Sequence, residues 1–214
     1  MRSAPATSAS GMPQAGPRRG RLILAAMIWF AASGSGTAML WRYENAPGAP
    51  AMAPRHWPAA SNLERTPAPP TLVMLIHPQC ACSRASIAEL ATLLARTPGP
   101  VAAHVLIWRP EGTPAGWEES DLWSSAAAIP GVDVRWDEHG SEAQRFGALT
   151  SGQTLLYSAA GDLLFSGGIT ASRGHVGDNT GRSAVLGFLA RDSSPPDRAA
   201  VFGCALANAT AAVP

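Results

Sequence analysis

The sequence predicts an α/β domain in which strands alternate with helices, and three observations support this class. Residues 71–77 (TLVMLIH) form a short apolar run typical of a buried strand. After a Pro-Gln break, apolar residues recur at helical spacing over residues 83–96. Later in the chain, two strand-like runs flank Ala160-Gly161, a pair typical of a tight hairpin. We therefore expect a mostly parallel sheet with an antiparallel edge and helices on both faces.

The N-terminal part of the chain predicts export. Residues 22–41 carry no charge, and at about 1.5 Å per residue a helix of this length reaches roughly 30 Å, enough to cross a bilayer. Residues 1–21 contain no acid and place Arg18, Arg19 and Arg21 just ahead of the apolar run. By the positive-inside rule this basic end stays in the cytoplasm and the rest of the chain is exported.

The apolar segment has two interpretations. As an anchor it has the right length and ends at Trp41 and Arg42, which are residue types found at membrane interfaces. As a signal peptide it offers an apolar stretch and then small residues, with Gly36 and Ala38 fitting a cleavage site. We favour a single-pass anchor in the bacterial inner membrane with the domain on the periplasmic side. The alternative is secretion into the periplasm after cleavage.

Composition excludes several classes of function. All 16 basic residues are arginine, so a site that needs lysine, such as a P-loop or a Schiff base, is excluded. The net charge is +1 and the folded part has no basic run, which argues against nucleic acid as a partner. The 3 cysteines permit one disulfide in an exported chain and leave one thiol over.

The remaining chain divides into a linker, a domain and a tail. Residues 42–70 are rich in proline and alanine, which predicts an extended spacer. Residues 71–192 suit one domain, and residues 193–214 form a tail that holds Cys204. Within the domain we expect strands at 71–77, 101–108, 132–136, 153–159 and 162–167, and helices at 83–96, 116–128, 140–147 and 182–191.

Two cysteines lie where the first strand turns into the first helix. Cys80 and Cys82 fall at the carboxyl end of the strand, where sheets of this class bind ligands. The unpaired N–H groups and dipole of a helix start favour a thiolate, which is the reactive form. We expect Cys80 to be a nucleophile, assisted by the Ser83 hydroxyl, with Cys82 or Cys204 as the resolving thiol. The alternative is a structural disulfide from Cys204 to one motif cysteine.

This order of elements resembles the thioredoxin-like superfamily, and more narrowly the exported, membrane-anchored ResA/TlpA type. The resemblance covers roughly residues 70–192, with Val132–Thr170 similar to the family's strand, short helix and hairpin. It implies a three-layer thioredoxin-like sandwich and thiol–disulfide exchange with thiols or disulfides of another exported protein. Partners in cytochrome or respiratory-complex assembly would follow from it, and no cofactor is implied.

The chain departs from the family pattern at three positions. Ser83 stands where the family has its resolving cysteine, Gln153 where it has a cis-proline, and Met74 where many members carry a buried carboxylate. We expect a trans peptide bond before Gln153, because a cis bond before a residue other than proline costs about 3 kcal/mol.

A glycine-rich loop follows the predicted hairpin, from Gly168 to Gly181. By resemblance this connection borders the active site. Polar residues there can bind a substrate, tune the thiolate or donate a proton, whereas in the plainer interpretation glycines turn the chain and polar groups face water. The candidate substrate-binding residues are Gln153, Arg173, His175, Asp178 and Asn179.

A metal carrier is the alternative function. His77, Cys80 and Cys82 offer one imidazole and two thiolates within six residues, and His175 is a candidate fourth ligand. Soft thiolates with imidazole suit Cu(I) or zinc. This hypothesis predicts copper as the cargo.

Overall fold

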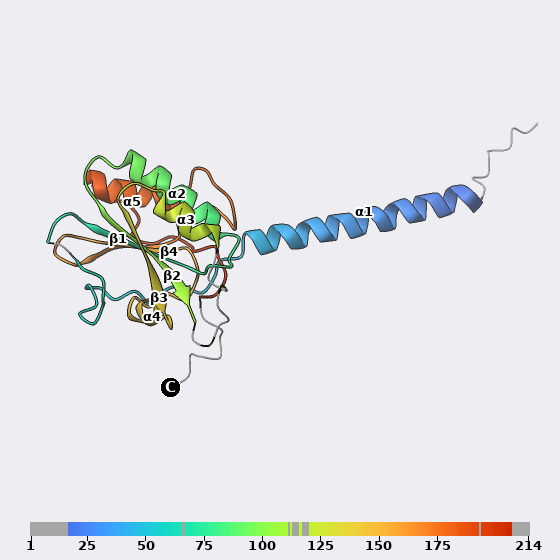
Figure 1. Cartoon of the computed structure of the whole chain (residues 1–214). Coiled ribbons are helices and arrows are strands. Elements are labelled where there is room, and N and C mark those ends of the chain that lie inside the picture. The colour runs from blue at the N-terminus through green and yellow to red at the C-terminus, as the bar shows by residue number, and fades with distance from the viewer. Residues whose placement is uncertain are drawn as a thin grey trace, which may run out of the picture. The chain divides into compact units, whose positions relative to one another are not determined.

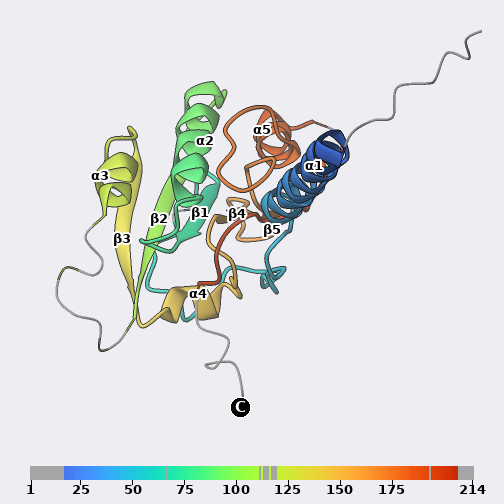
Figure 2. The ribbon, with the colours of Figure 1, turned by 90° about the vertical axis from the view of Figure 1, so that its right-hand side faces the viewer.

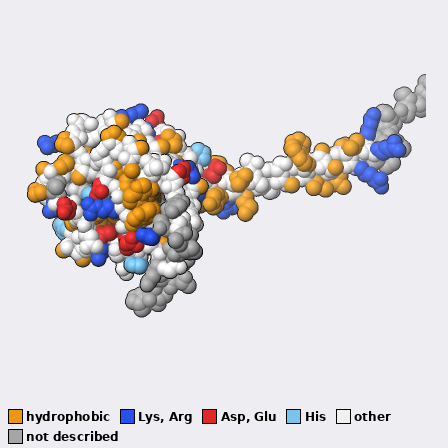
Figure 3. Space-filling view, in the orientation of Figure 1, with side chains coloured by type: hydrophobic (Ala, Val, Ile, Leu, Met, Phe, Trp, Pro, Cys, Tyr) orange, Lys and Arg blue, Asp and Glu red, His pale blue; other side chains and the backbone are white. Residues whose placement is uncertain are grey.

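The computed structural model describes residues 17–65, 67–110, 112, 116, 120–192 and 194–206, and the chain divides into two units, Met1–Tyr43 and Glu44–Pro214. Helix α1 (Pro17–Glu44) is long and apolar enough to cross a membrane by length and composition, with a mean hydropathy of 1.6. Hydrophobic side chains lie along it, and arginines gather at its N-terminal end (Figure 3). Such a helix is consistent with either an anchor or a signal segment.

A five-stranded mixed sheet forms the centre of the second unit, in the order β3-β2-β1-β4-β5 (Figure 2). Strands β1 and β2 pair in parallel, as do β2 and β3, whereas β4 is antiparallel to both β1 and β5. The strands are β1 (Thr71–Ile76), β2 (Ala102–Arg109), β3 (Val132–Glu138), β4 (Gln153–Tyr157) and β5 (Leu163–Gly167). The predicted strands and the antiparallel edge are confirmed.

Helices cover both faces of the sheet (Figure 1). On one face Leu90 of α2, Leu122 of α3 and Val185 of α5 pack with strand residues such as Met74. On the other face α4 contributes Ala143 to a second apolar cluster. The helices are α2 (Ser83–Arg96), α3 (Asp121–Ala127), α4 (Ser141–Arg145) and α5 (Thr180–Ala190). The thioredoxin-like sandwich expected from the sequence is therefore confirmed.

Helix α3 is shorter than predicted. The sequence pattern placed its start at residue 116, whereas the structure begins the helix at Asp121, after an extended Ser120. Residues 117–119 lie outside the described residues. Helix α2, in contrast, has the predicted bounds, 83–96. Its apolar side chains have a whole sheet face to cover, and burying each contributes about 1.5–3 kcal/mol.

The proline-rich segment after α1 packs on the domain, so the prediction of a spacer over 42–70 is wrong for its first part. The Gly48 N–H donates to the Val201 carbonyl (2.8 Å), and the Met52 N–H donates to that of Gly147 (3.0 Å). Trp57 stacks edge-on against Phe146 and Tyr157, with ring centroids 5.1 and 5.2 Å apart. The sheet face that carries only the short α4 leaves apolar surface exposed, and this segment covers it.

Candidate active site at the cysteines

Cys80 lies in the turn that joins β1 to α2. The Cys80 N–H donates to the His77 carbonyl (3.1 Å), and the Ser83 N–H donates to the Cys80 carbonyl (2.9 Å). Pro78 has no N–H to continue the strand pairing, and α2 starts at Ser83. This places the Cys80 sulfur at the N-terminal end of a helix, where the dipole favours negative charge.

Four donors act on the Cys80 sulfur and lower its pKa. Burial alone would raise the pKa, because a buried thiolate loses its hydration. The Cys204 thiol and N–H, the Ser83 hydroxyl and the Cys82 N–H all donate to this sulfur and outweigh that cost. The pKa of Cys80 therefore lies below its ordinary value. A lowered pKa favours the thiolate, which is the nucleophilic form of cysteine.

Ser151 extends this network behind Ser83. The two hydroxyl oxygens lie 2.8 Å apart and are buried, and Ser151 Oγ accepts the His77 N–H at 2.8 Å. Ser151 therefore links the His77 N–H to Ser83, whose hydroxyl lowers the pKa of Cys80. Ser151 was not among the site residues predicted from the sequence. Its only signal is its place two residues before Gln153, the position that the resemblance marks.

The C-terminal segment brings Cys204 to the site. The Ser151 N–H donates to the Cys204 carbonyl (2.8 Å), and the Leu206 N–H donates to that of Leu149 (2.9 Å). Thr150 and Ala205 form an antiparallel bridge between the two segments. A strand-like pairing of residues far apart in the sequence therefore holds the Cys204 thiol against Cys80.

Cys82 and Cys204 have raised pKa values, unlike Cys80. Burial is the largest cause for both, and hydrogen bonding to Cys80 and its negative charge raise them further. The pKa of Cys204 reaches about 12. Arg173 lowers the pKa of both thiols. Its Nη1 donates a hydrogen bond to the Gly203 carbonyl (2.5 Å). The two neighbouring thiols are therefore harder to ionise than Cys80.

The accessibility of Cys80 differs from the expectation of an open sulfur at the edge of the sheet. Its residue is only 2% exposed, whereas Cys204 is exposed and Cys82 is intermediate. All three cysteines are free thiols, so the alternative of a structural disulfide is not what this structure contains. Hydrogen bonds from Cys204, Ser83 and Cys82 favour the Cys80 thiolate despite this burial.

Of the predicted loop residues, Arg173 is the one that contacts the cysteines. Asp178 and Asn179 instead belong to a network around Glu89, which is 0% exposed. Asn179 Nδ2 donates to Glu89 (3.2 Å), and Arg182 pairs with both Glu89 and Asp178. This network fixes the loop to α2 and α5, and it satisfies a carboxylate that would otherwise be buried without a partner.

The other two predicted binding residues do not reach the cysteines by any hydrogen bond of the described residues. Gln153 is 0% exposed, and its Nε2 donates to Ser166 Oγ (3.2 Å) on β5. The peptide bond before Gln153 is trans, as predicted, since Ala68-Pro69 is the one cis bond in the described chain. His175 Nδ1 lies 2.8 Å from Ser172 Oγ.

The described residues contain no group of three or more His, Cys, Asp or Glu side chains placed to hold a metal ion. His77 Nδ1 accepts a hydrogen bond from the Gln79 N–H (3.1 Å). The His77 ring packs against the Trp108 ring, with their centroids 5.0 Å apart. The copper or zinc carrier with His77, Cys80, Cys82 and His175 as ligands stays a prediction.

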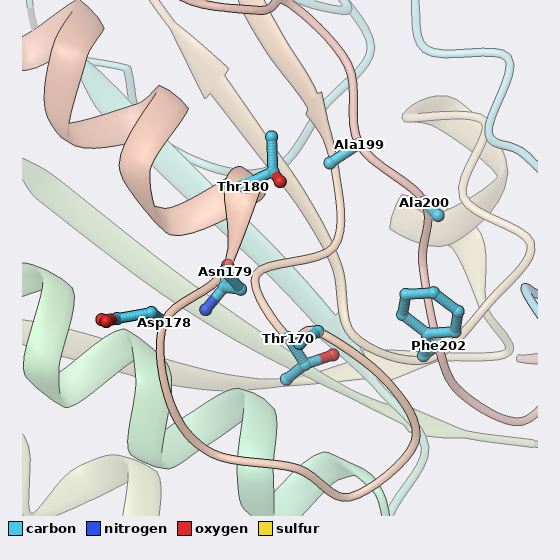
Figure 4. Close-up of a pocket in the computed structure, with 9 residues that line it drawn as sticks. Thr170, Asp178, Asn179, Thr180, Ala199, Ala200 and Phe202 are labelled. Carbon is cyan, nitrogen blue, oxygen red and sulfur yellow. The ribbon is translucent and has the colours of Figure 1, made fainter. Parts of the chain in front are cut away.

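A pocket of about 400 Å³ lies beside the C-terminal segment. Asp178 and Asn179 line it on one side and Phe202 on the other, with Thr170 between them (Figure 4). Phe202 precedes Cys204 by two residues. The pocket therefore borders the segment that carries the second thiol of the site.

Comparison with known proteins supports the fold. No family model matches the sequence, and no curated protein matches it. A hypothetical protein of Sinorhizobium meliloti 1021 is 20% identical, with 75% of this chain and 93% of that one covered and a TM-score of 0.53. An uncharacterized conserved protein of Geobacillus kaustophilus is 16% identical, with 76% and 92% covered and a TM-score of 0.54. These similarities establish the fold.

A weaker similarity is to a secreted disulfide oxidoreductase of Mycobacterium tuberculosis, described as homologous to E. coli DsbE. It is 15% identical and covers 59% of this chain and 84% of that one, with a TM-score of 0.40.

Proposed function

We propose that this chain is an exported thiol–disulfide oxidoreductase of the ResA/TlpA type, held at the membrane by α1, with Cys80 as its nucleophile. The observation that carries the proposal is the place of Cys80 at the start of α2, beside the Ser83–Ser151 hydroxyl pair and the segment that holds Cys204. Hydrogen bonds from these neighbours lower the pKa of Cys80 although burial opposes it. A purely structural cysteine does not need its thiolate stabilised in this way.

The reaction begins with attack of the Cys80 thiolate on a disulfide of an exported partner protein. A bond forms between Cys80 and one partner sulfur, and the other partner sulfur leaves as a thiolate. The helix start and the Ser83 hydroxyl hold the attacking charge before the reaction. By the family resemblance, the partners would be proteins of cytochrome or respiratory-complex assembly.

Reduction of insulin disulfides by the full-length chain tests this assignment. We expect Cys80→Ser to lose the activity and to show no fast-reacting thiol with iodoacetamide at neutral pH. Ala81→Ser, on the exposed neighbouring residue, is the matched control and should react as the unmodified chain does. A Cys80→Ser chain that reduces insulin at the normal rate would show that another residue is the nucleophile.

A further inference from the structure

Residues 203–206 lie outside the five-stranded sheet and form one antiparallel bridge, between Ala205 and Thr150. Two backbone hydrogen bonds hold them to residues 149–151, through Ser151 N–H to Cys204 O (2.8 Å) and Leu206 N–H to Leu149 O (2.9 Å). Arg173 adds a third contact through the Gly203 carbonyl. We refer to residues 203–206 as the thiol strand.

We propose that Cys204 is the resolving thiol of the exchange reaction and that the thiol strand is a detachable element that delivers it to Cys80. This inference rests on the proposed function and selects between Cys82 and Cys204, which the sequence left open. The backbone pairing with residues 149–151 holds Cys204 beside Cys80, and both the thiol and the N–H of Cys204 hydrogen-bond to the Cys80 sulfur.

The Cys82 thiol also hydrogen-bonds to Cys80, but its backbone makes it poorly placed for the same role. It is the N-cap residue of α2, and its carbonyl accepts the Ala85 N–H at 3.1 Å. Its own N–H donates to the Cys80 sulfur, and the Ser83 N–H closes a turn onto the Cys80 carbonyl (2.9 Å). A bond between Cys80 and Cys82 would close a small ring across this turn, and disulfides with such geometry are strained.

Access to Cys80 explains why the thiol strand should detach. Cys80 is 2% exposed, and the exposed Cys204 lies against it. A partner disulfide reaches the Cys80 sulfur only when this contact opens. Two backbone hydrogen bonds and the Arg173 contact hold the strand, and Leu206 anchors its end in the second apolar cluster, where it is 2% exposed. The Cys204 end can open locally while Leu206 stays in place, at a lower cost than global unfolding.

The second step resolves the mixed disulfide between Cys80 and the partner. The Cys204 sulfur attacks Cys80 in the mixed disulfide, a Cys80–Cys204 bond forms, and the bond from Cys80 to the partner breaks. The partner sulfur leaves with the electron pair and takes up the proton that Cys204 gives away. Over both steps the two cysteines are oxidised by two electrons and one partner disulfide is reduced to two thiols.

The charge on Cys80 controls the order of these steps. After burial, the causes that raise the pKa of Cys204 are its hydrogen bond to Cys80 and the negative charge of Cys80. Both disappear once Cys80 is held in a disulfide. Cys204 therefore donates a proton while Cys80 is the nucleophile and becomes easier to ionise when its own attack is due, with Arg173 favouring its thiolate.

Oxidised glutathione is the probe for the test. The full-length reduced chain is mixed with it, and cysteine-containing peptides are mapped by mass spectrometry without reduction. We expect a Cys80–Cys204 link in the unmodified chain and in Cys82→Ser, with two glutathione thiols released per chain. Cys204→Ser should keep glutathione on Cys80 and release it at least tenfold more slowly than Cys82→Ser.

Gly203→Ala tests delivery by the strand while keeping every thiol. A Cβ at residue 203 would lie 1.9 Å from the Ser151 carbonyl oxygen, so the strand must shift. We expect the mixed disulfide on Cys80 to form and then to resolve at least tenfold more slowly than in the unmodified chain, whereas Ala205→Ser, at an exposed residue of the same strand, should resolve normally.

The outcomes separate the two proposals. A Cys80–Cys82 link, or unchanged glutathione release in Cys204→Ser, would overturn the role of Cys204 and leave Cys80 as nucleophile. Normal resolution in Gly203→Ala would overturn delivery by the thiol strand. A Cys80→Ser chain that still exchanges with glutathione at the normal rate would contradict the proposed function itself.

Discussion

The hydroxyl oxygens of Ser83 and Ser151 lie 2.8 Å apart in a buried position, although 68 residues separate them in the sequence. Ser83 belongs to the first turn of α2, and Ser151 comes just before β4. Their contact joins the backbone N–H of His77 to the Cys80 sulfur through two hydroxyl groups. The first prediction concerns this chain of donors.

Removal of the Ser83 hydroxyl should raise the pKa of Cys80. The Ser83 hydroxyl is one of the groups that lower the pKa of Cys80, and a hydrogen bond to a charged group contributes about 1.5–3 kcal/mol, so Ser83→Ala should raise this pKa. Because Cys80 has a lowered pKa, its alkylation by iodoacetamide should slow about tenfold near neutral pH and converge with the unmodified rate at high pH. Ser151→Ala should act in the same direction by less, and exposed Ser183→Ala should not. Equal pH profiles for all four chains would contradict the network.

The ionisation of Cys204 should depend on Cys80. Burial is the largest cause of its raised pKa of about 12, and the hydrogen bond to Cys80 and the charge of Cys80 follow. In Cys80→Ser the charge is lost, so the pKa of Cys204 should fall toward its ordinary value. Alkylation of Cys204, followed by peptide mass spectrometry, should then begin at lower pH than in the unmodified chain. The same onset in both chains would show that burial alone sets this pKa.

Arg173 should hold the thiol strand in place. Its guanidinium donates to the Gly203 carbonyl and lowers the pKa of Cys82 and Cys204. Arg173→Gln should speed amide exchange of residues 203–206 several-fold and shift alkylation of Cys82 to higher pH. Arg96→Gln, at the exposed last turn of α2, is the control. Unchanged exchange in residues 203–206 would place the stabilisation of the strand elsewhere.

Trp57 should stabilise the domain although it lies in the proline-rich segment. Its ring contacts those of Phe146 and Tyr157. Loss of a packed aromatic side chain costs about 3 kcal/mol, so Trp57→Ala should lower the free energy of unfolding by roughly this amount in urea titrations followed by circular dichroism. Met52→Ala, at a residue that is 85% exposed, should change it by less than about 0.5 kcal/mol. A Trp57 variant as stable as the Met52 variant would mean that the segment is only loosely attached.

Glu89 should matter more to stability than an exposed acid. It is 0% exposed and pairs with Arg182, which is 5% exposed. Removing one partner of a buried ion pair leaves the other charge unpaired and costs about 3–5 kcal/mol. Glu89→Ala should therefore lower the free energy of unfolding far more than Glu138→Ala, whose exposed pair with Arg109 contributes about 0–1 kcal/mol. Similar losses in the two variants would show that the pair around Glu89 is not a buried charge pair in solution.

The site was only partly predictable from the sequence. The local sequence predicts both the position of Cys80 near a helix start and the donor Ser83, three residues further along the chain. The assignment of Asp178 and Asn179 to the cysteines rested on resemblance alone, and the buried Glu89 draws both toward α2 instead. The local sequence does not show that Glu89 is buried, because polar residues occur on both faces of its helix.

Local sequence determined the strands, the helices and the junction that carries Cys80, because apolar spacing and the residues that end a strand or start a helix act within a few positions. Only the tertiary structure decided which distant residues surround that sulfur. The 44–63 segment, Ser151 and Cys204 reach their places through backbone hydrogen bonds and packing between segments far apart in the chain. Backbone groups pair in the same way whatever side chains they carry, so these contacts leave almost no signal in the sequence.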